Sequence, residues 1–143
     1  MKSAEYKNLN LLQMAELATK IANELTVGSV VCLSGDLGTG KTFFAAMLIN
    51  KLTGKADSVT SPTFNLVHNY PSPKGEVWHF DLYRLKSQAE VQQLGIDDAL
   101  RYGISIIEWP EIIQSILPEN CVRIALDFAK DESKRNLSIS FAE

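Results

Sequence analysis

The order of apolar and polar residues predicts that helices and strands alternate along the first part of the chain. Between residues 10 and 26, apolar side chains recur at every third or fourth position, which is the spacing of one helix face, and Asn10 is suited to cap the first turn. A short apolar run at residues 29–33 predicts a buried strand, and residues 42–52 return to helical character. The polar residues 1–8 predict either a short edge strand or a loose arm.

The later part of the chain predicts more strands than helices. Residues 65–70 and 76–83 alternate on both sides of a Pro- and Gly-rich turn, which is typical of a β-hairpin. Residues 104–108 form an apolar strand, and alternation at 121–128 and 135–141 predicts an antiparallel pair. Short helices are expected at residues 87–93, 97–102 and 111–117. These patterns predict a three-layer α/β fold whose mostly parallel central sheet carries antiparallel strands toward the C-terminus.

A glycine-rich turn lies between the first predicted strand and the helix that follows it. Residues 35–42 match the phosphate-binding pattern G-x-x-x-x-G-K-[ST] at every fixed position, and the pattern requires this strand before it and this helix after it. The alternative is a turn followed by an ordinary surface lysine, which the full match in this setting disfavours. The sequence therefore predicts a P-loop that binds a nucleoside triphosphate.

Each residue type in this loop has a physical role. Gly35 and Gly40 allow backbone angles and a close approach to phosphate that a Cβ atom would prevent. Lys41 is expected to contact the β- and γ-phosphates, and the Thr42 hydroxyl is expected to bind Mg²⁺. Nucleotide contacts are predicted for Gly38, Thr39, Gly40, Lys41, Thr42 and Phe43.

Two carboxylates end predicted strands and are candidates for the metal and the chemistry. Asp81 ends the hairpin, where P-loop enzymes place an acid near Mg²⁺, although it could instead cap a turn or pair with Arg84. Glu108 ends an apolar strand beside the crevice where α/β sheets bind ligands, although it could be a cap or a surface ion pair. His79 shares a strand face with Asp81, and a structural role is the more common one for such a histidine.

Two further positions leave alternatives open. Residues 57–64 place hydroxyl side chains around a proline, and the segment is either a passive turn or a nucleotide-sensing loop in which Ser61 or Thr63 approaches the γ-phosphate. Trp109, next to Glu108, either stacks on a ligand or packs in the core.

Composition limits the class of protein. The 143 residues fit one domain, 1–143, since domains cluster at about 100 to 150 residues. A net charge of −3 provides no basic surplus, so any RNA is expected to be held by another subunit. Cys32 and Cys121 are expected to be buried, reduced thiols. The absence of a membrane-spanning apolar run and of a signal-peptide pattern predicts a cytoplasmic protein.

Several short motifs together resemble those of the bacterial TsaE (YjeE) family. They are residues 35–42 (GDLGTGKT), 61–67 (SPTFNLV), 79–85 (HFDLYRL), 94–96 (LGI) and 107–111 (IEWPE), in the order of the family and across most of the chain. The resemblance implies a small ATPase that binds ATP or ADP with Mg²⁺. It also implies a role in the threonylcarbamoyl modification (t6A) of tRNA adenosine 37, together with the proteins TsaB and TsaD, with tRNA reached indirectly through that complex.

The resemblance also implies roles for single residues. Thr42 and Glu108 match the family's Mg²⁺-associated positions, Asp81 matches its second acidic position, and Trp109 matches a tryptophan beside the site. Lys41 and its loop match the family's phosphate contacts. Two positions depart from the family, since Thr39 stands where alanine is common and Phe43 stands where a second threonine is frequent.

Three rival functions remain open at this point. A small-molecule kinase would need a basic lid, and its candidate cations Lys130, Lys134 and Arg135 lie among acidic residues. A regulatory GTPase would need an N-K-x-D guanine-binding pattern, which residues 50–53 lack. The third alternative is a nucleotide-gated binding module with negligible turnover, because the chain shows no obvious general base and no arginine finger.

Overall fold

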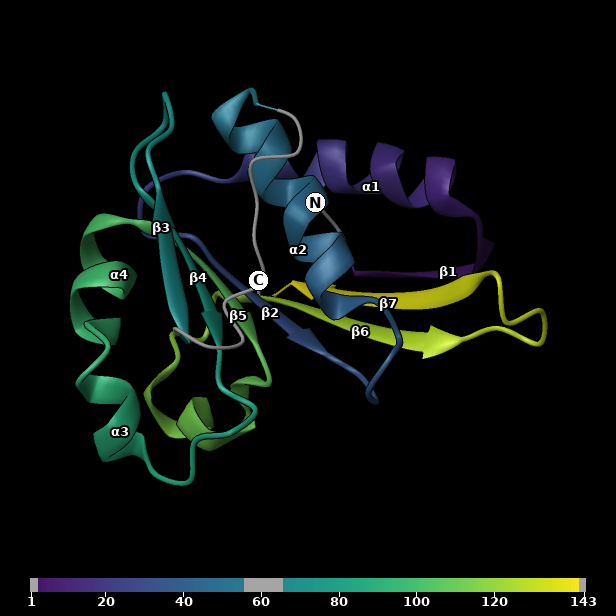
Figure 1. The fold of residues 1–143 in the computed structure, drawn as a ribbon. Coiled ribbons are helices and arrows are strands. Elements are labelled where there is room, and N and C mark those ends of the chain that lie inside the picture. Colours follow the sequence, from purple (N-terminus) through teal and green to yellow (C-terminus); the bar gives the residue numbers. More distant parts are fainter. Residues whose placement is uncertain (1–2, 56–65, 142–143) are drawn as a thin grey trace.

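The protein folds around a single seven-stranded sheet, seen in a computed structural model that describes residues 3–55 and 66–141 (Figure 1). The strand order is β1-β7-β6-β2-β5-β4-β3. The strands are β1 (Ala4–Leu9), β2 (Val30–Ser34), β3 (Val67–Tyr70), β4 (Val77–Asp81), β5 (Ile104–Glu108), β6 (Val122–Phe128) and β7 (Arg135–Phe141). The helices are α1 (Leu11–Glu24), α2 (Lys41–Thr53), α3 (Gln88–Gln92), α4 (Ile96–Tyr102) and the 3₁₀ helix η1 (Pro110–Ile116).

The centre of the sheet is parallel and both of its edges are antiparallel. Strands β6, β2, β5 and β4 run parallel, with β2 paired to both β5 and β6. The antiparallel pairs are β3 with β4 at one edge, and β6 with β7 and β7 with β1 at the other. The predicted α/β class is therefore confirmed, with antiparallel pairs at both edges of the sheet. Residues 4–9 form the edge strand β1, so of the two alternatives for the N-terminal segment, an edge strand or a loose arm, the first is confirmed.

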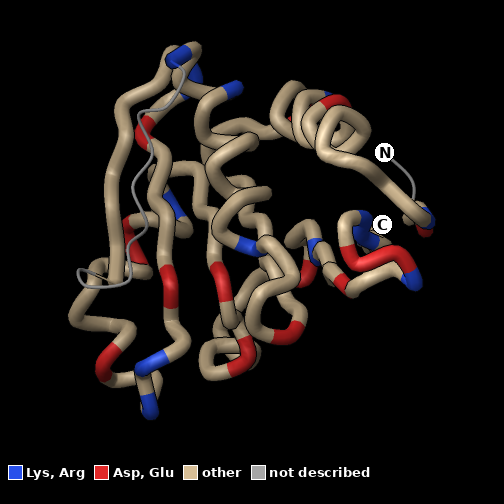
Figure 2. Tube along the Cα trace, turned by 45° about the vertical axis from the view of Figure 1, so that its right-hand side comes forward, with Lys and Arg blue, Asp and Glu red and all other residues tan. Residues whose placement is uncertain are grey.

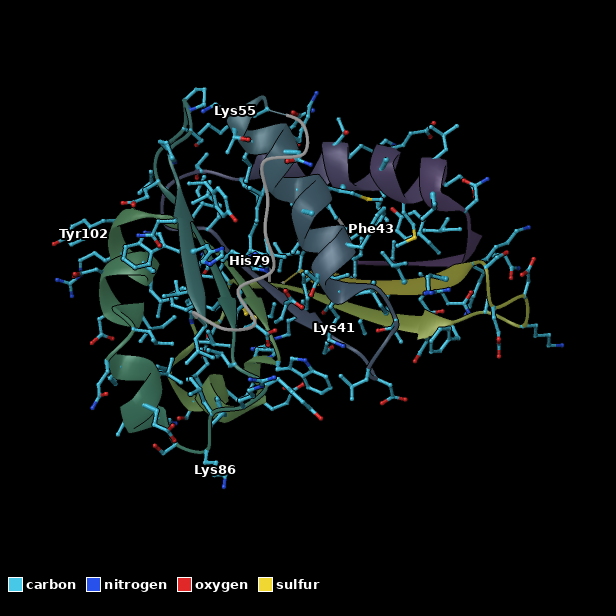
Figure 3. The ribbon with its side chains drawn as sticks, in the orientation of Figure 1. Lys41, Phe43, Lys55, His79, Lys86 and Tyr102 are labelled. Atoms are coloured by element: carbon cyan, nitrogen blue, oxygen red, sulfur yellow. The ribbon has the colours of Figure 1, made fainter. Side chains whose placement is uncertain are left out.

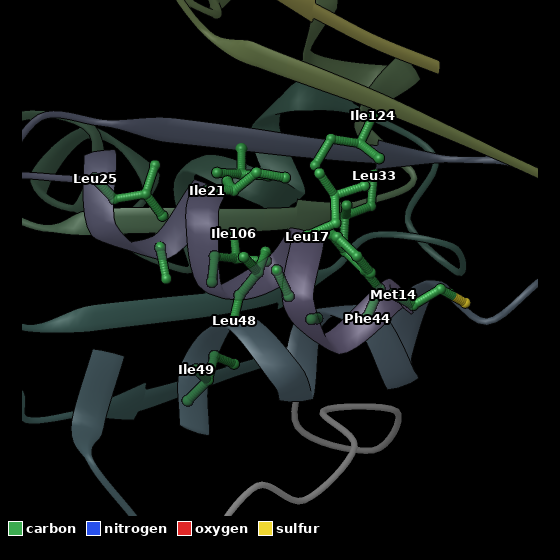
Figure 4. Packing of buried hydrophobic residues seen from close by; sticks show 14 of the residues in the cluster. Met14, Leu17, Ile21, Leu25, Leu33, Phe44, Leu48, Ile49, Ile106 and Ile124 are labelled. Carbon is green, nitrogen blue, oxygen red and sulfur yellow. The ribbon is translucent and has the colours of Figure 1, made fainter. Parts of the chain in front are cut away.

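Helices cover both faces of the sheet and give the predicted three layers. Helices α1 and α2 lie together on one face, and α3, α4 and η1 lie on the other (Figure 1). Figure 4 shows the first interface, where Phe44 and Leu48 of α2 and Ile21 of α1 are fully buried against the strands. Burial of each such side chain contributes about 1.5–3 kcal/mol to folding, so this interface holds α2 firmly against β2.

Helix α1 begins as the sequence predicts and ends two residues earlier than expected. The Asn10 side chain accepts from the Gln13 amide at 2.8 Å, and the Gln13 side chain accepts from the Asn10 amide at 2.9 Å, which makes a capping box. The helix ends at Glu24 because Leu25 adopts an extended backbone. The Lys74 ammonium, from the turn between β3 and β4, donates to the carbonyl oxygens of Asn23 and Leu25 at 2.9 Å each.

The short helix predicted at residues 111–117 is present, one residue earlier, and it is not an α-helix. The segment is the 3₁₀ helix η1, and Ile113 departs from helical angles with φ −116° and ψ 19°. Because the Ile113 side chain is fully buried, packing against the sheet overrides the local helical preference. Among the described residues, no helix is both long enough and apolar enough to cross a bilayer.

The two cysteines should be unreactive in the folded protein. Both are free and buried, as predicted, and burial raises the pKa of the Cys32 thiol from 9.0 to about 12, with the neighbouring Cys121 adding to the shift. Since only the thiolate is nucleophilic, Ellman's reagent at pH 8 should label neither residue in native protein and both after unfolding in guanidinium. Rapid labelling of native Cys32 would contradict this burial.

Candidate functional site

The loop between β2 and α2 has the backbone conformation of an anion-binding turn. Gly40 adopts the left-handed conformation with φ 101° and is followed directly by the first turn of α2, which has no side-chain cap. Gly35 has φ 143°, and a Cβ atom there would overlap the Leu126 carbonyl oxygen on β6. The first-turn amides and the helix dipole of α2 therefore face the loop without competition from a capping side chain.

Lys41 lies inside the loop, and the residue is only 5% exposed (Figure 3). Its ammonium donates to the carbonyl oxygens of Gly35 and Asp36 at 2.7 and 2.9 Å, and lies 4.2 Å from the centroid of the Trp109 ring. Burial lowers the pKa of Lys41, while the negative charge of Glu108 opposes that shift. The cation is thus partly desolvated and directed into the loop, where an anion would be attracted strongly.

Glu108 connects the loop helix to the neighbouring strand. Its Oε1 accepts from the Thr42 hydroxyl at 2.6 Å, and its Oε2 lies 2.6 Å from His79 Nε2. Glu108 is 2% exposed and His79 is fully buried, so both contacts are shielded from water. The structure therefore brings the predicted metal residues Thr42 and Glu108 into direct contact.

Asp81 lies beside Glu108 because the two residues are paired across β4 and β5. Its Oδ1 accepts from the Tyr83 amide at 3.2 Å. Burial raises the pKa of Asp81, the Tyr83 amide lowers it, and the charge of Glu108 raises it further. The parallel pairing therefore places both predicted acids at the same end of the sheet, next to the loop.

An open cavity of about 450 Å³ joins these groups. Its walls include Gly38, Phe43 and Trp109 together with Lys41 and the two acids. The Trp109 ring lies 4.7 Å from that of Tyr83, and the left-handed backbone of Trp109, with φ 57°, turns its side chain out of β5 toward the loop. Phe43 is 51% exposed at the rim, which leaves it accessible to a ligand or a partner.

Thr39 takes a supporting position in the loop. Its side chain is fully buried and donates to the Asp36 carbonyl at 2.8 Å, and its own amide lies 3.3 Å from the same oxygen. The carbonyl of Thr39 accepts from Arg135 Nε at 2.8 Å. The prediction for Thr63, and the choice between a turn and a sensing loop at residues 57–64, lie outside the described residues.

The donor set fits a magnesium ion that is shared with phosphate. Among residues 3–55 and 66–141, no three His, Cys, Asp or Glu side chains are arranged to hold a metal alone. Thr42, Asp81 and Glu108 instead offer one hydroxyl and two carboxylates at the loop. Mg²⁺ in nucleotide enzymes is usually bound by one or two carboxylates plus substrate phosphates, so this set suits a metal that arrives with a nucleotide.

Two contacts of the site could not be read from the sequence. A structural role is the more common one for a histidine such as His79, and its ring contacts Glu108 in the core; the two-residue spacing from Asp81 is the sequence signal for that contact. Arg135, a candidate lid cation only for the rival kinase, donates to the Thr39 carbonyl in the glycine-rich loop and lies 4.5 Å from the centre of the Phe128 ring.

Charges of both signs are interspersed along the described trace (Figure 2). The net charge of the whole chain is −3. The electrostatic attraction that dominates nucleic-acid binding is therefore weak for this chain alone.

Comparisons with known proteins give a consistent result. The model of the family "Threonylcarbamoyl adenosine biosynthesis protein TsaE" matches residues 9–137. The chain is 41% identical over 117 residues to a Rickettsia bellii protein named "tRNA threonylcarbamoyladenosine biosynthesis protein TsaE", covering 82% of this chain and 81% of that one. A Bacillus subtilis protein of the same name is 30% identical over 135 residues, covering 94% and 84%.

A solved structure supports the fold independently. The crystal structure of Bacillus subtilis YdiB superposes with a TM-score of 0.78, covering 99% of this chain and 87% of that one at 24% identity. The same layered α/β arrangement is therefore present in an experimentally determined protein.

Proposed function

The chain belongs to the TsaE family, and on that premise we propose that it binds Mg²⁺·ATP at the loop between β2 and α2 and hydrolyses it. The hydrolysis would support the threonylcarbamoyladenosine modification of tRNA, which is the process that the names of its relatives state. The proposed partners are the proteins TsaB and TsaD, and the tRNA would be reached through that complex.

The contact between Thr42 and Glu108 is the single observation that carries this proposal. It joins the first turn of α2 to the end of β5, at 2.6 Å, beside the buried ammonium of Lys41. A glycine-rich turn without a ligand-binding role would not require a buried cation, Lys41, next to two carboxylates, Asp81 and Glu108, at the ends of neighbouring strands. Such convergence is typical of sites that bind and transfer phosphoryl groups.

Each residue has a role that follows from its surroundings. Lys41 would exchange its loop carbonyls for phosphate oxygens, and the amides of Gly38 to Thr42 would surround the phosphates. When bound, Mg²⁺ would neutralise charge on the phosphates and share the ligands Thr42, Glu108 and Asp81. Asp81 lies next to Glu108 at the wall of the same cavity and is suited to bind the metal or to orient a water beside it.

The environment of Lys41 favours slow turnover by the chain alone. Its ammonium is already satisfied by two loop carbonyls and the Trp109 ring, so nucleotide binding must replace these contacts. A partner that contacts the exposed rim of the cavity at Phe43 would be placed to stabilise the state in which Lys41 binds phosphate instead of the loop carbonyls. The kinase alternative is weakened, because Arg135, one of its three candidate lid cations, donates a hydrogen bond to the Thr39 carbonyl and is not free to close over a substrate.

Nucleotide titration and phosphate release test this function. Isothermal titration with Mg²⁺ should show tighter binding of ATP than of GTP, and hydrolysis should rise when TsaB and TsaD are added. Equal or tighter GTP binding would contradict the assignment of ATP. Binding without hydrolysis, even with both partners present, would leave the alternative of a nucleotide-gated binding module.

A further inference from the structure

His79 is a fully buried polar side chain that the proposed chemistry does not use directly. It lies on β4 with its Nε2 atom 2.6 Å from Glu108 Oε2, while its Nδ1 atom has no hydrogen-bond partner among the described residues. Burial of an imidazole with one unsatisfied nitrogen costs free energy. The short hydrogen bond with Glu108 is therefore the polar contact that offsets the cost of burying the His79 ring.

The parallel register explains why His79 reaches Glu108. Asp81 is paired directly with Glu108, and His79, two residues earlier on β4, is paired with Ile106. Side chains two residues apart on a strand point to the same face, so His79, Asp81 and Glu108 share one face of the sheet. His79 thus approaches Glu108 from within the core, while Asp81 approaches it from the side of the loop.

The two oxygens of Glu108 have different partners. Thr42 donates to Oε1, and because a carboxylate is only an acceptor, the hydrogen of the other contact lies on His79 Nε2. One hydrogen bond would leave the carboxylate free to rotate about its terminal bond. Two hydrogen bonds from opposite sides fix its plane and direct Oε1 toward α2.

We propose that His79 is a positioning residue that fixes the Glu108 carboxylate for the Mg²⁺ site. The inference rests on the proposed function, since it concerns how that site holds its metal. Hydrogen-bond partners that orient metal-binding side chains typically change metal affinity by about 10- to 100-fold when they are removed. His79 should therefore affect the Mg²⁺-dependent part of nucleotide binding and leave the loop's own contacts with phosphate intact.

The experiment measures ATP affinity by isothermal titration in Mg²⁺ and in EDTA, and takes the ratio of the two dissociation constants. His79→Leu should reduce the Mg²⁺ enhancement by about tenfold or more, while affinity in EDTA stays near that of wild type. His79→Gln, whose amide can donate from near the Nε2 position, should restore most of the enhancement. His79→Asn, whose shorter side chain places its amide near Nδ1, should not.

The outcomes separate this inference from the proposed function. Wild-type protein that binds no ATP would overturn both. If wild-type protein binds ATP more tightly in Mg²⁺ than in EDTA, the proposed function stands. If the Gln and Asn variants then show the same Mg²⁺ enhancement as each other, the role of His79 alone is overturned. The comparison of these two polar variants does not depend on whether the Leu variant folds, and circular dichroism of each variant verifies its fold.

Discussion

Glu108→Gln should lower the rate of ATP hydrolysis by about 100-fold or more, a change typical for removal of one group that stabilises charge in a transition state. The fold should be retained, and ATP affinity in Mg²⁺ should fall by a smaller factor, about tenfold, because the metal loses the charge of one ligand. The variant keeps the shape of the side chain and its ability to accept from Thr42. It loses the negative charge that would attract the metal on the phosphates. Phosphate release and isothermal titration on the same preparations measure the two effects separately.

Glu119→Gln is a matched control for the loss of charge. Glu119 is an exposed carboxylate in the connection between η1 and β6, so its neutralisation changes the net charge equally without touching the loop. We expect wild-type hydrolysis from this control. Unchanged hydrolysis in Glu108→Gln would show that Glu108 does not take part in catalysis. An equal fall in both variants would show that the loss of net charge, and not the position of Glu108, causes the effect.

Features that depend on local sequence were predicted well. The glycine-rich loop is recognisable as a candidate phosphate-binding turn because the positions of Gly35, Gly40 and Lys41 are fixed by one continuous backbone turn. The strand that ends at Glu108 is readable from a mostly apolar run in which only Ser105 is polar before the final carboxylate, since a parallel strand buried on both faces needs no polar alternation. Given the fold class, adjacent ends of parallel strands bring Asp81 and Glu108 together.

Features that depend on tertiary packing were not predictable in the same way. The contact between His79 and Glu108 requires the register of β4 against β5, which a single sequence does not fix. The bond from Arg135 to the Thr39 carbonyl spans 96 residues of sequence. The helix type of η1 is decided by the burial of Ile113, which outweighs the preference of a segment only seven residues long.

Gly35→Ala should abolish nucleotide binding at micromolar ATP and destabilise the protein. The left-handed backbone at φ 143° costs an alanine of order 1–3 kcal/mol. The new Cβ atom would also overlap the Leu126 carbonyl oxygen and lie 2.8 Å from Thr39 Oγ1. Because Leu126 belongs to the sheet, the loop must move away instead, and the Gly35 carbonyl would be displaced from Lys41. Thermal unfolding and isothermal titration with ATP measure the two losses.

Gly28→Ala separates backbone strain from this collision. Gly28 also has a positive φ, 94°, and precedes the same strand β2 at its opposite end, but a Cβ atom there would have no neighbour within 4 Å. We expect a loss of stability of about 1–2 kcal/mol with ATP affinity unchanged. If Gly35→Ala bound ATP as tightly as Gly28→Ala, the close packing of the loop on β6 could not be what shapes the phosphate site. The pair of variants therefore tests whether contact with the sheet, beyond the flexibility of glycine, sets the geometry of the loop.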